Sequence, residues 1–135
     1  MKFSLVSYVS EDIISISDII SFISKEIEET LKNKDYGEDI ESVYIGIVCV
    51  NPIFSHFFKY REKYIKSKKA VEYSIVLNYN DFKNFSEKDS VKKIVTYILI
   101  SIEKIIDKYK IKQFDVDKYI RDIKELALQK NWFNI

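Results

Sequence analysis

A run of isoleucines near the start of the chain recurs at intervals of three and four residues. The run consists of Ile13, Ile16, Ile20, Ile23, Ile27 and Leu31. This spacing places their side chains on one face of an α-helix, which then needs a partner surface to bury them. Ser10 suits the N-cap, and Glu11 and Asp12 suit the positive end of the helix dipole. The pattern therefore predicts an amphipathic helix ending near Lys34, packed against another layer.

Segments rich in β-branched and aromatic residues predict four strands around this helix. They span residues 2–9, 40–50, 54–65 and 70–79. The second strand is apolar on both faces, with Tyr44, Gly46 and Val48 on one of them, which predicts a central position in the sheet. The last three strands follow one another through short connections. Such an arrangement is typical of an antiparallel meander.

Two further helices are predicted after the strands. One spans residues 86–108, where Ser86 and Asp89 resemble a capping box and an apolar middle indicates burial on two sides. The other spans residues 116–130 and has Asp115 as its cap. The order β-α-β-β-β-α-α predicts an α+β fold. We expect an antiparallel four-stranded sheet with three helices packed mainly on one face.

Length and composition bound the class of protein. The chain has 135 residues, of which 47% are hydrophobic and only three are Gly or Pro, so we expect a single domain over residues 1–135 and no disordered linker. The single cysteine excludes an intramolecular disulfide framework. The first residues show no secretory signal and no stretch approaches the length of a membrane span. We therefore expect a cytoplasmic protein.

Catalytic and metal-binding candidates are few. Cys49 and His56 form the one nucleophile–base pair available, but Cys49 falls in an apolar strand, where a thiol usually acts as a small hydrophobe. Asp115 and Asp117 stand at a helix start, where capping explains them without a metal. No glycine-rich phosphate loop is present. The sequence therefore predicts no enzymatic activity, no metal and no cofactor.

Charge is distributed unevenly along a chain whose net charge is +1. Residues 1–41 carry ten acidic side chains and four lysines, with a dense acidic stretch at residues 35–41. Residues 42–69 carry six basic side chains and Glu62. Such a basic block attracts nucleic acid or an acidic protein surface, although lysines also protect exposed strand edges. The charge layout alone does not choose between these interpretations.

The segment 54–64 combines aromatic and basic residues more densely than any other. As a strand, it would place Phe57, Lys59, Arg61 and Lys63 on one face and the intervening residues on the other. Aromatic rings beside lysines would suit single-stranded nucleic acid, whereas Tyr and Arg anchors would suit a protein interface. A third interpretation is a sheet with its aromatics in the core and its lysines in water. The residues leave all three open.

Several segments resemble one known family. They are residues 49–54 (CVNPIF), 58–64 (FKYREKY) and 72–79 (EYSIVLNY), with similar stretches at 1–4 (MKFS) and 114–119 (FDVDKY). Together they look like the immunity protein 44 family of bacterial polymorphic toxin systems. The resemblance implies a small cytoplasmic protein that binds and neutralises a cognate toxin domain by covering its active or substrate-binding surface. It implies no catalysis, and no membrane partner is expected.

The expected partner contacts lie in the basic aromatic segment. They are Lys59, Tyr60, Arg61, Lys63 and Tyr64. The acidic stretch 35–41 stays an alternative binding face, because an inhibitor of a basic toxin is expected to be acidic. The alternative function is a single-stranded nucleic-acid-binding module that uses residues 54–69. Strand order and oligomeric state stay open at this level.

Overall fold

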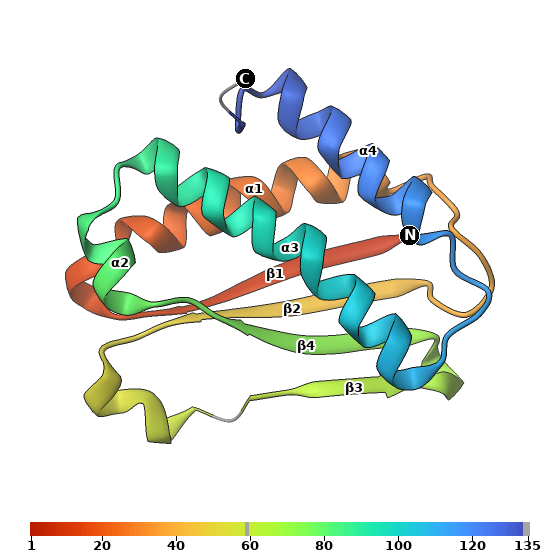
Figure 1. The fold of residues 1–135 in the computed structure, drawn as a ribbon, viewed down its shortest axis with the longest axis horizontal. Coiled ribbons are helices and arrows are strands. Elements are labelled where there is room, and N and C mark those ends of the chain that lie inside the picture. Colours follow the sequence, from red (N-terminus) through yellow and green to blue (C-terminus); the bar gives the residue numbers. More distant parts are fainter. Residues whose placement is uncertain (59, 134–135) are drawn as a thin grey trace.

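A computed structural model describes residues 1–58 and 60–133, in which four strands form one sheet with the helices gathered on one side (Figure 1). The strands are β1 (Lys2–Val9), β2 (Ser42–Cys49), β3 (Glu62–Ile65) and β4 (Ala70–Val76). The helices are α1 (Ser15–Leu31), α2 (Tyr79–Asn84), α3 (Glu87–Tyr109) and α4 (Val116–Gln129). Three short 3₁₀ segments are η1 (Glu11–Ile13), η2 (Pro52–Phe57) and η3 (Lys66–Lys68). The α+β class is confirmed.

The sheet has the strand order β1-β2-β4-β3, so the prediction of an antiparallel meander is wrong. β1 runs parallel to β2, and β2 runs parallel to β4; only β3 and β4 pair antiparallel. Helix α1 carries the chain back across the sheet after β1, which makes β2 parallel to β1. The long apolar β4 takes the place beside β2 and leaves the short, polar β3 at the edge. The predicted central position of β2 is confirmed.

The predicted strand at residues 54–65 is mostly wrong. Residues 52–57 form the 3₁₀ segment η2, and β3 contains four residues. The Asn51 side chain accepts a hydrogen bond from the Ile53 amide at 3.2 Å, and Pro52 fixes its own backbone in a turn-compatible conformation. A local turn therefore overrides the β-propensity of the aromatic residues that follow.

The number of helices also differs from the prediction of three. The additional helix is α2, which begins at Tyr79, the last residue of the predicted fourth strand, and the Asn78 side chain caps it by accepting a hydrogen bond from the Asp81 amide at 3.1 Å. The caps predicted for the other helices are confirmed at Ser86 and Asp115, each of which accepts a hydrogen bond from a backbone amide at 3.1 Å. Ser10 makes no side-chain cap; its hydroxyl accepts from the Asn51 amide instead.

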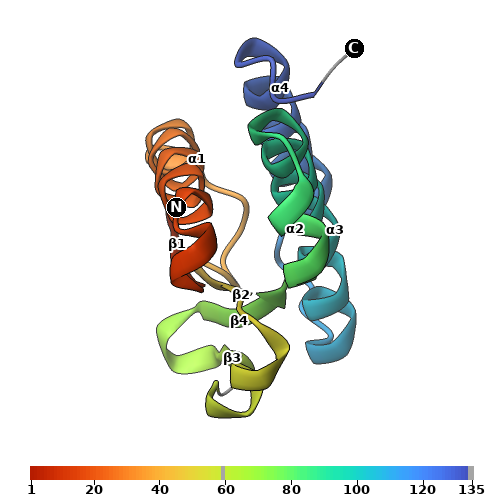
Figure 2. The same cartoon turned by 90° about the vertical axis from the view of Figure 1, so that its left-hand side faces the viewer.

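The core lies between the sheet and the helices. α1 packs along β1, α3 contacts β3 and β4, and α4 packs on α1 and α3 as a further layer (Figures 1 and 2). The predicted apolar stripe, which begins at Ile13 in η1 and continues along α1, is buried throughout. Burial of α3 on two sides is also confirmed, because Ile94, Val95 and Ile98 are fully buried between sheet and helices. None of the helices in the described ranges has the length and hydropathy of a membrane span.

Candidate protein-binding face

The helices leave the other face of the sheet without a covering layer, and we call this surface the open face. It is formed by Val6, Tyr8, Tyr44, Gly46, Arg61, Lys63, Glu72, Ser74 and Val76, whose positions alternate with those of the core. Val48 points to the same side of β2 but is only 3% exposed. Large apolar side chains remain in solvent there: Val6 is 49% exposed, Tyr8 47% and Val76 56%. Exposed aromatic and aliphatic residues gathered on one surface are typical of an interaction site.

A groove of about 470 Å³ runs into the middle of the open face. One row of residues in register across β1, β2 and β4 passes through the groove: Val6, Gly46 and Ser74. Tyr8 and Tyr44 lie on opposite sides of this row along the strands. The ring of Phe58 packs edge-on against Tyr8, with their centroids 6.0 Å apart. The floor is low because Gly46 has no side chain.

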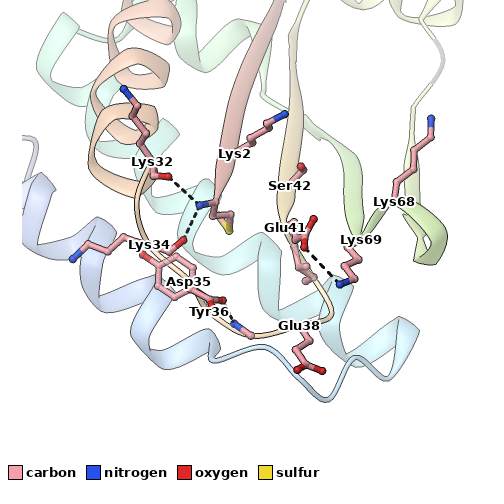
Figure 3. A pocket seen from close by; sticks show the side chains of 13 residues that line it. Lys2, Lys32, Lys34, Asp35, Tyr36, Glu38, Glu41, Ser42, Lys68 and Lys69 are labelled. Atoms are coloured by element: carbon pink, nitrogen blue, oxygen red, sulfur yellow. Dashed lines mark hydrogen bonds and ion pairs between the residues drawn. The ribbon is translucent and has the colours of Figure 1, made fainter.

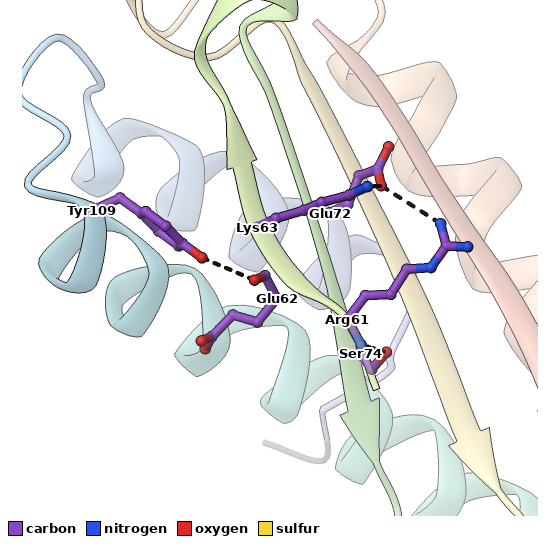
Figure 4. Close-up of polar contacts among 6 residues, drawn as sticks. All are labelled: Arg61, Glu62, Lys63, Glu72, Ser74 and Tyr109. Atoms are coloured by element: carbon purple, nitrogen blue, oxygen red, sulfur yellow. Dashed lines mark hydrogen bonds and ion pairs between the residues drawn. The ribbon is translucent and has the colours of Figure 1, made fainter. Parts of the chain in front are cut away.

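The β3 side of the open face is cationic. Glu72 forms ion pairs with Arg61 at 3.7 Å and with Lys63 at 3.3 Å. Figure 4 shows both basic side chains reaching toward Glu72 from the same face of β3. The backbone there is held by Ser74, whose hydroxyl accepts a hydrogen bond from the Arg61 amide at 3.0 Å. Arg61 and Lys63 remain 68% and 50% exposed, so one carboxylate faces two accessible cations.

The opposite side of β3 faces helix α3. The Tyr109 hydroxyl donates to the Glu62 carbonyl at 2.8 Å, and Lys108 pairs with the Glu62 carboxylate (Figure 4 shows the tyrosine contact). This pairing raises the pKa of Lys108. β3 is therefore anchored on one side by α3, and Lys63 and the preceding Arg61 lie on the other side.

The structure brings together only part of the predicted contact set. Arg61 and Lys63 lie side by side on the open face, and Tyr60 is exposed at the end of that face, where it lines a small pocket together with Val76. Tyr64 points to the helix side: its hydroxyl donates to the Asp39 carbonyl at 2.6 Å. Burial, followed by the charge of Asp39, raises the Tyr64 pKa. Lys59 lies outside the described residues.

Sequence reasoning did not select the β1 and β2 residues of this face. Tyr8, Tyr44 and Gly46 carry no motif, and Glu72 looked like an ordinary polar position in a half-buried strand. The available signal was alternation: Val6 and Tyr8 share one face of the first strand, as do Tyr44 and Gly46 in the second. With helices on the opposite face, these large residues had to remain in solvent.

The acidic stretch at residues 35–41 is tied into the fold and surrounded by lysines. The Asp39 carboxylate accepts from the backbone amides of Lys112 and Gln113 at 3.3 and 2.9 Å. The Asp35 carboxylate accepts from the Gly37 amide at 2.9 Å, and Glu41 pairs with Lys69 at 3.6 Å. The adjoining cavity has a volume of about 610 Å³. Figure 3 shows the side chains that line it. Five lysines line it, namely Lys2, Lys32, Lys34, Lys68 and Lys69.

The arrangement of Cys49 and His56 does not favour nucleophilic catalysis. Cys49 is fully buried on the helix-covered side of β2, and burial, followed by the charge of Asp12, raises its pKa to about 11. A thiol with that pKa is almost entirely protonated at neutral pH. His56 lies exposed in η2. Across residues 1–58 and 60–133, no group of three or more His, Cys, Asp or Glu side chains could hold a metal ion.

Comparison with known proteins identifies the family. The model of a family described as immunity protein 44 matches residues 1–129 of the 135-residue chain. The searches of curated proteins and of solved structures returned no match. The family match covers every strand and helix described above. It extends beyond the short segments that suggested the resemblance, and the chain therefore belongs to the immunity protein 44 family.

Proposed function

We propose that this protein neutralises a cognate bacterial toxin domain by laying the open face of its sheet over the toxin's active or substrate-binding surface. The observation that carries the proposal is the combination, on one uncovered face, of tyrosine and valine side chains with Arg61 and Lys63. Tyrosine and arginine are among the residues that supply most binding energy in protein interfaces. Occlusion needs a rigid surface and no chemistry by the immunity protein, in keeping with the protonated, buried state of Cys49.

The edges of the sheet suit docking less well than the face. A partner that adds a strand needs free backbone groups along an edge. On β1, the Leu5 amide already donates to the Ser24 hydroxyl of α1 at 3.0 Å. On β3, the Glu62 carbonyl accepts from Tyr109. Side chains of α1 and α3 thus occupy edge positions that an added strand would use.

The acidic stretch 35–41 is also a weaker candidate for the toxin contact. Asp35 and Asp39 direct their carboxylates at backbone amides of this chain, and Glu41 pairs with Lys69. A carboxylate engaged in this way has less capacity to bind a partner, and the nearby lysines reduce the negative potential. The open face has both apolar anchors and accessible charge, so we assign the contact to it.

Growth rescue tests the proposal directly. The toxic C-terminal domain encoded beside this gene is expressed with and without the immunity protein, and the purified pair is examined by size exclusion. We expect rescue and a stable complex. Reversing two charges together, Arg61→Glu and Lys63→Glu, should weaken toxin binding by about 30-fold or more, as expected for interface hot spots. The matched control is Lys104→Glu with Lys124→Glu, two exposed positions on α3 and α4.

Each part of the proposal has its own contradicting result. Absence of both rescue and complex, with a folded immunity protein and an active toxin, would overturn toxin neutralisation. A complex that tolerates the Arg61 and Lys63 reversals as well as the control would overturn the assignment to the open face. Tight, steeply salt-dependent binding of a single-stranded oligonucleotide, with no toxin complex, would favour the alternative nucleic-acid-binding module.

A further inference from the structure

The groove on the open face is centred on Gly46, although the backbone conformation at this position does not require a glycine. Gly46 lies inside β2, where glycine weakens a strand because it has high unfolded-state entropy and no side chain to pack. Among the glycines, only Gly37 has a positive φ. A Cβ added at Gly46 would meet Tyr8 at 3.5 Å and Ser74 at 3.8 Å, which are ordinary contacts. Alanine would therefore fit at this position, so neither the backbone conformation nor a close contact accounts for the glycine.

We propose that this groove is a socket for one large apolar side chain on a protruding loop of the toxin, and that a carboxylate next to that side chain pairs with Arg61. The inference rests on the proposed function and specifies the chemistry of the partner surface. Glycine inside a strand often marks a place where a ligand or another chain approaches closely. Here the close approach is made by the toxin.

The lining of the groove selects an apolar occupant. Val6, Tyr8, Tyr44, Val48 and Phe58 contribute aliphatic and aromatic surface around Gly46, whereas Ser74, Glu72 and Arg61 line the groove toward β4 and β3. Its volume of about 470 Å³ falls in the range of pockets that enclose small ligands. A groove of this size accepts one side chain and its adjoining backbone, whereas a whole helix would need a longer surface. Burying a Phe, Leu or Met side chain there should strengthen binding by about tenfold or more.

The charges beside the groove favour a carboxylate on the toxin, next to the apolar side chain. Arg61 and Lys63 share the single carboxylate of Glu72, which leaves this side with one excess positive charge. The 3.7 Å ion pair of Arg61 is too long for a hydrogen bond, so the guanidinium has donors to offer a partner. Glu72 draws both cations toward the groove. A carboxylate from the toxin can accept two parallel hydrogen bonds from Arg61, which is the preferred geometry of this pair.

The test adds side-chain volume at the centre of the socket. Gly46→Val adds a β-branched side chain that favours a strand, and Gly46→Ala adds a single carbon. Affinity for the toxin domain encoded beside the gene is measured by calorimetry, and thermal unfolding is recorded for every variant. We expect unchanged or higher thermal stability, a loss of affinity of about 30-fold or more for Gly46→Val, and a smaller loss for Gly46→Ala.

Two further variants separate the socket from general contact with the face. Ser4→Val adds bulk on β1, outside the lining of the groove, and should weaken binding by no more than about threefold. Arg61→Lys keeps the charge but loses the planar fork, and should weaken binding by about tenfold. Its effect should persist at high salt, because the lost contact is a close hydrogen-bonded pair and not long-range attraction.

The possible outcomes distinguish this inference from the proposed function. If wild-type protein binds the toxin and folded Gly46→Val binds equally well, the socket is refuted and toxin neutralisation stands. Equal losses for Gly46→Val and Ser4→Val would likewise refute a specific socket. If wild-type protein does not bind the toxin at all, the proposed function fails first. If Gly46→Val does not fold, the affinity of Gly46→Ala is compared with that of the wild-type protein. Full affinity in Gly46→Ala would then count against the socket.

Discussion

Two tyrosines in contact with each other, Tyr36 and Tyr119, differ in whether the hydroxyl group has a hydrogen-bond partner. The Tyr119 hydroxyl is fully buried and has no hydrogen-bond partner within residues 1–58 and 60–133. The Tyr36 ring packs edge-on against it with centroids 5.7 Å apart, but the Tyr36 hydroxyl donates to the Asp122 carboxylate at 2.6 Å. Burial raises the pKa of both phenols, and the Asp122 hydrogen bond and charge raise that of Tyr36 further. The partner of the Tyr36 hydroxyl could not be assigned from sequence, because Tyr36 and Asp122 are 86 positions apart.

Removing one hydroxyl should raise the stability of the protein, and removing the other should lower it. Tyr119→Phe deletes a buried polar group without a partner, so the free energy of unfolding should rise by about 1 kcal/mol. Tyr36→Phe deletes a hydrogen bond to a carboxylate and should lower the free energy of unfolding by about 1.5 kcal/mol. Denaturant unfolding at neutral pH measures both. Equal destabilisation by the two changes would mean that the Tyr119 hydroxyl has a partner.

At the scale of elements, the segment after α1 shows how a local turn joins distant parts of the chain. The Gly37 backbone adopts a φ of 122°, a conformation that favours glycine. Next to it, the Asp115 amide donates to the Tyr36 carbonyl at 2.6 Å and the Asp39 amide donates to the Gln113 carbonyl at 3.1 Å. The segment before β2 is therefore fastened to the segment that precedes α4. The sequence left this acidic stretch as a candidate binding face because the partners of Asp39 and Glu41 lie far along the chain.

The two glycines of the chain should respond differently to alanine. A Cβ at Gly37 would lie 2.2 Å from the Gln113 carbonyl oxygen, in addition to the strained φ. Gly37→Ala should therefore lower the free energy of unfolding by at least about 2 kcal/mol. Gly46→Ala, with an ordinary backbone and contacts of 3.5 Å or more, should be neutral or stabilising. Thermal or denaturant unfolding compares them, and similar effects at both positions would contradict this account of Gly37.

For the whole molecule, buried phenols and the buried thiol couple stability to alkaline pH. Burial raises the pKa of Tyr73 and Tyr119 above the ordinary value of 10.0, and that of Cys49 to about 11. The unfolded chain therefore releases these protons at a lower pH than the folded protein does. The stabilisation is present below the unfolded pKa values, and it is lost as pH rises through them and toward the folded values.

The free energy of unfolding should consequently fall above about pH 9, and more steeply above pH 10. Each fully buried tyrosine contributes a slope of about 1.4 kcal/mol per pH unit in that range. Denaturant titrations between pH 7 and 11 measure the curve. Tyr119→Phe removes one of the phenols whose ionisation is coupled to unfolding, so the free energy of unfolding should fall less steeply above about pH 10. An unchanged slope in that variant would show that Tyr119 does not take part.

The sequence by itself determined the local features of this protein. The isoleucine stripe, the caps at Ser86 and Asp115, and the alternation of Arg61 and Lys63 with Glu62 and Tyr64 depend on residues within a few positions of one another. The family was also indicated by short segments of sequence. Local turns were harder to predict, because Asn51 and Asn78 redirected segments whose composition favoured strands.

Only the tertiary structure decided the strand order, the parallel pairing of β2 with β4, and the open face. These depend on which apolar surfaces meet after the chain has crossed the sheet, so no window of neighbouring residues contains the information. Val6, Gly46 and Ser74 come together because three strands pair in one register, and Arg61 joins them because β3 lies at the edge. The groove exists because the helices pack on one face of the sheet and leave the other in solvent.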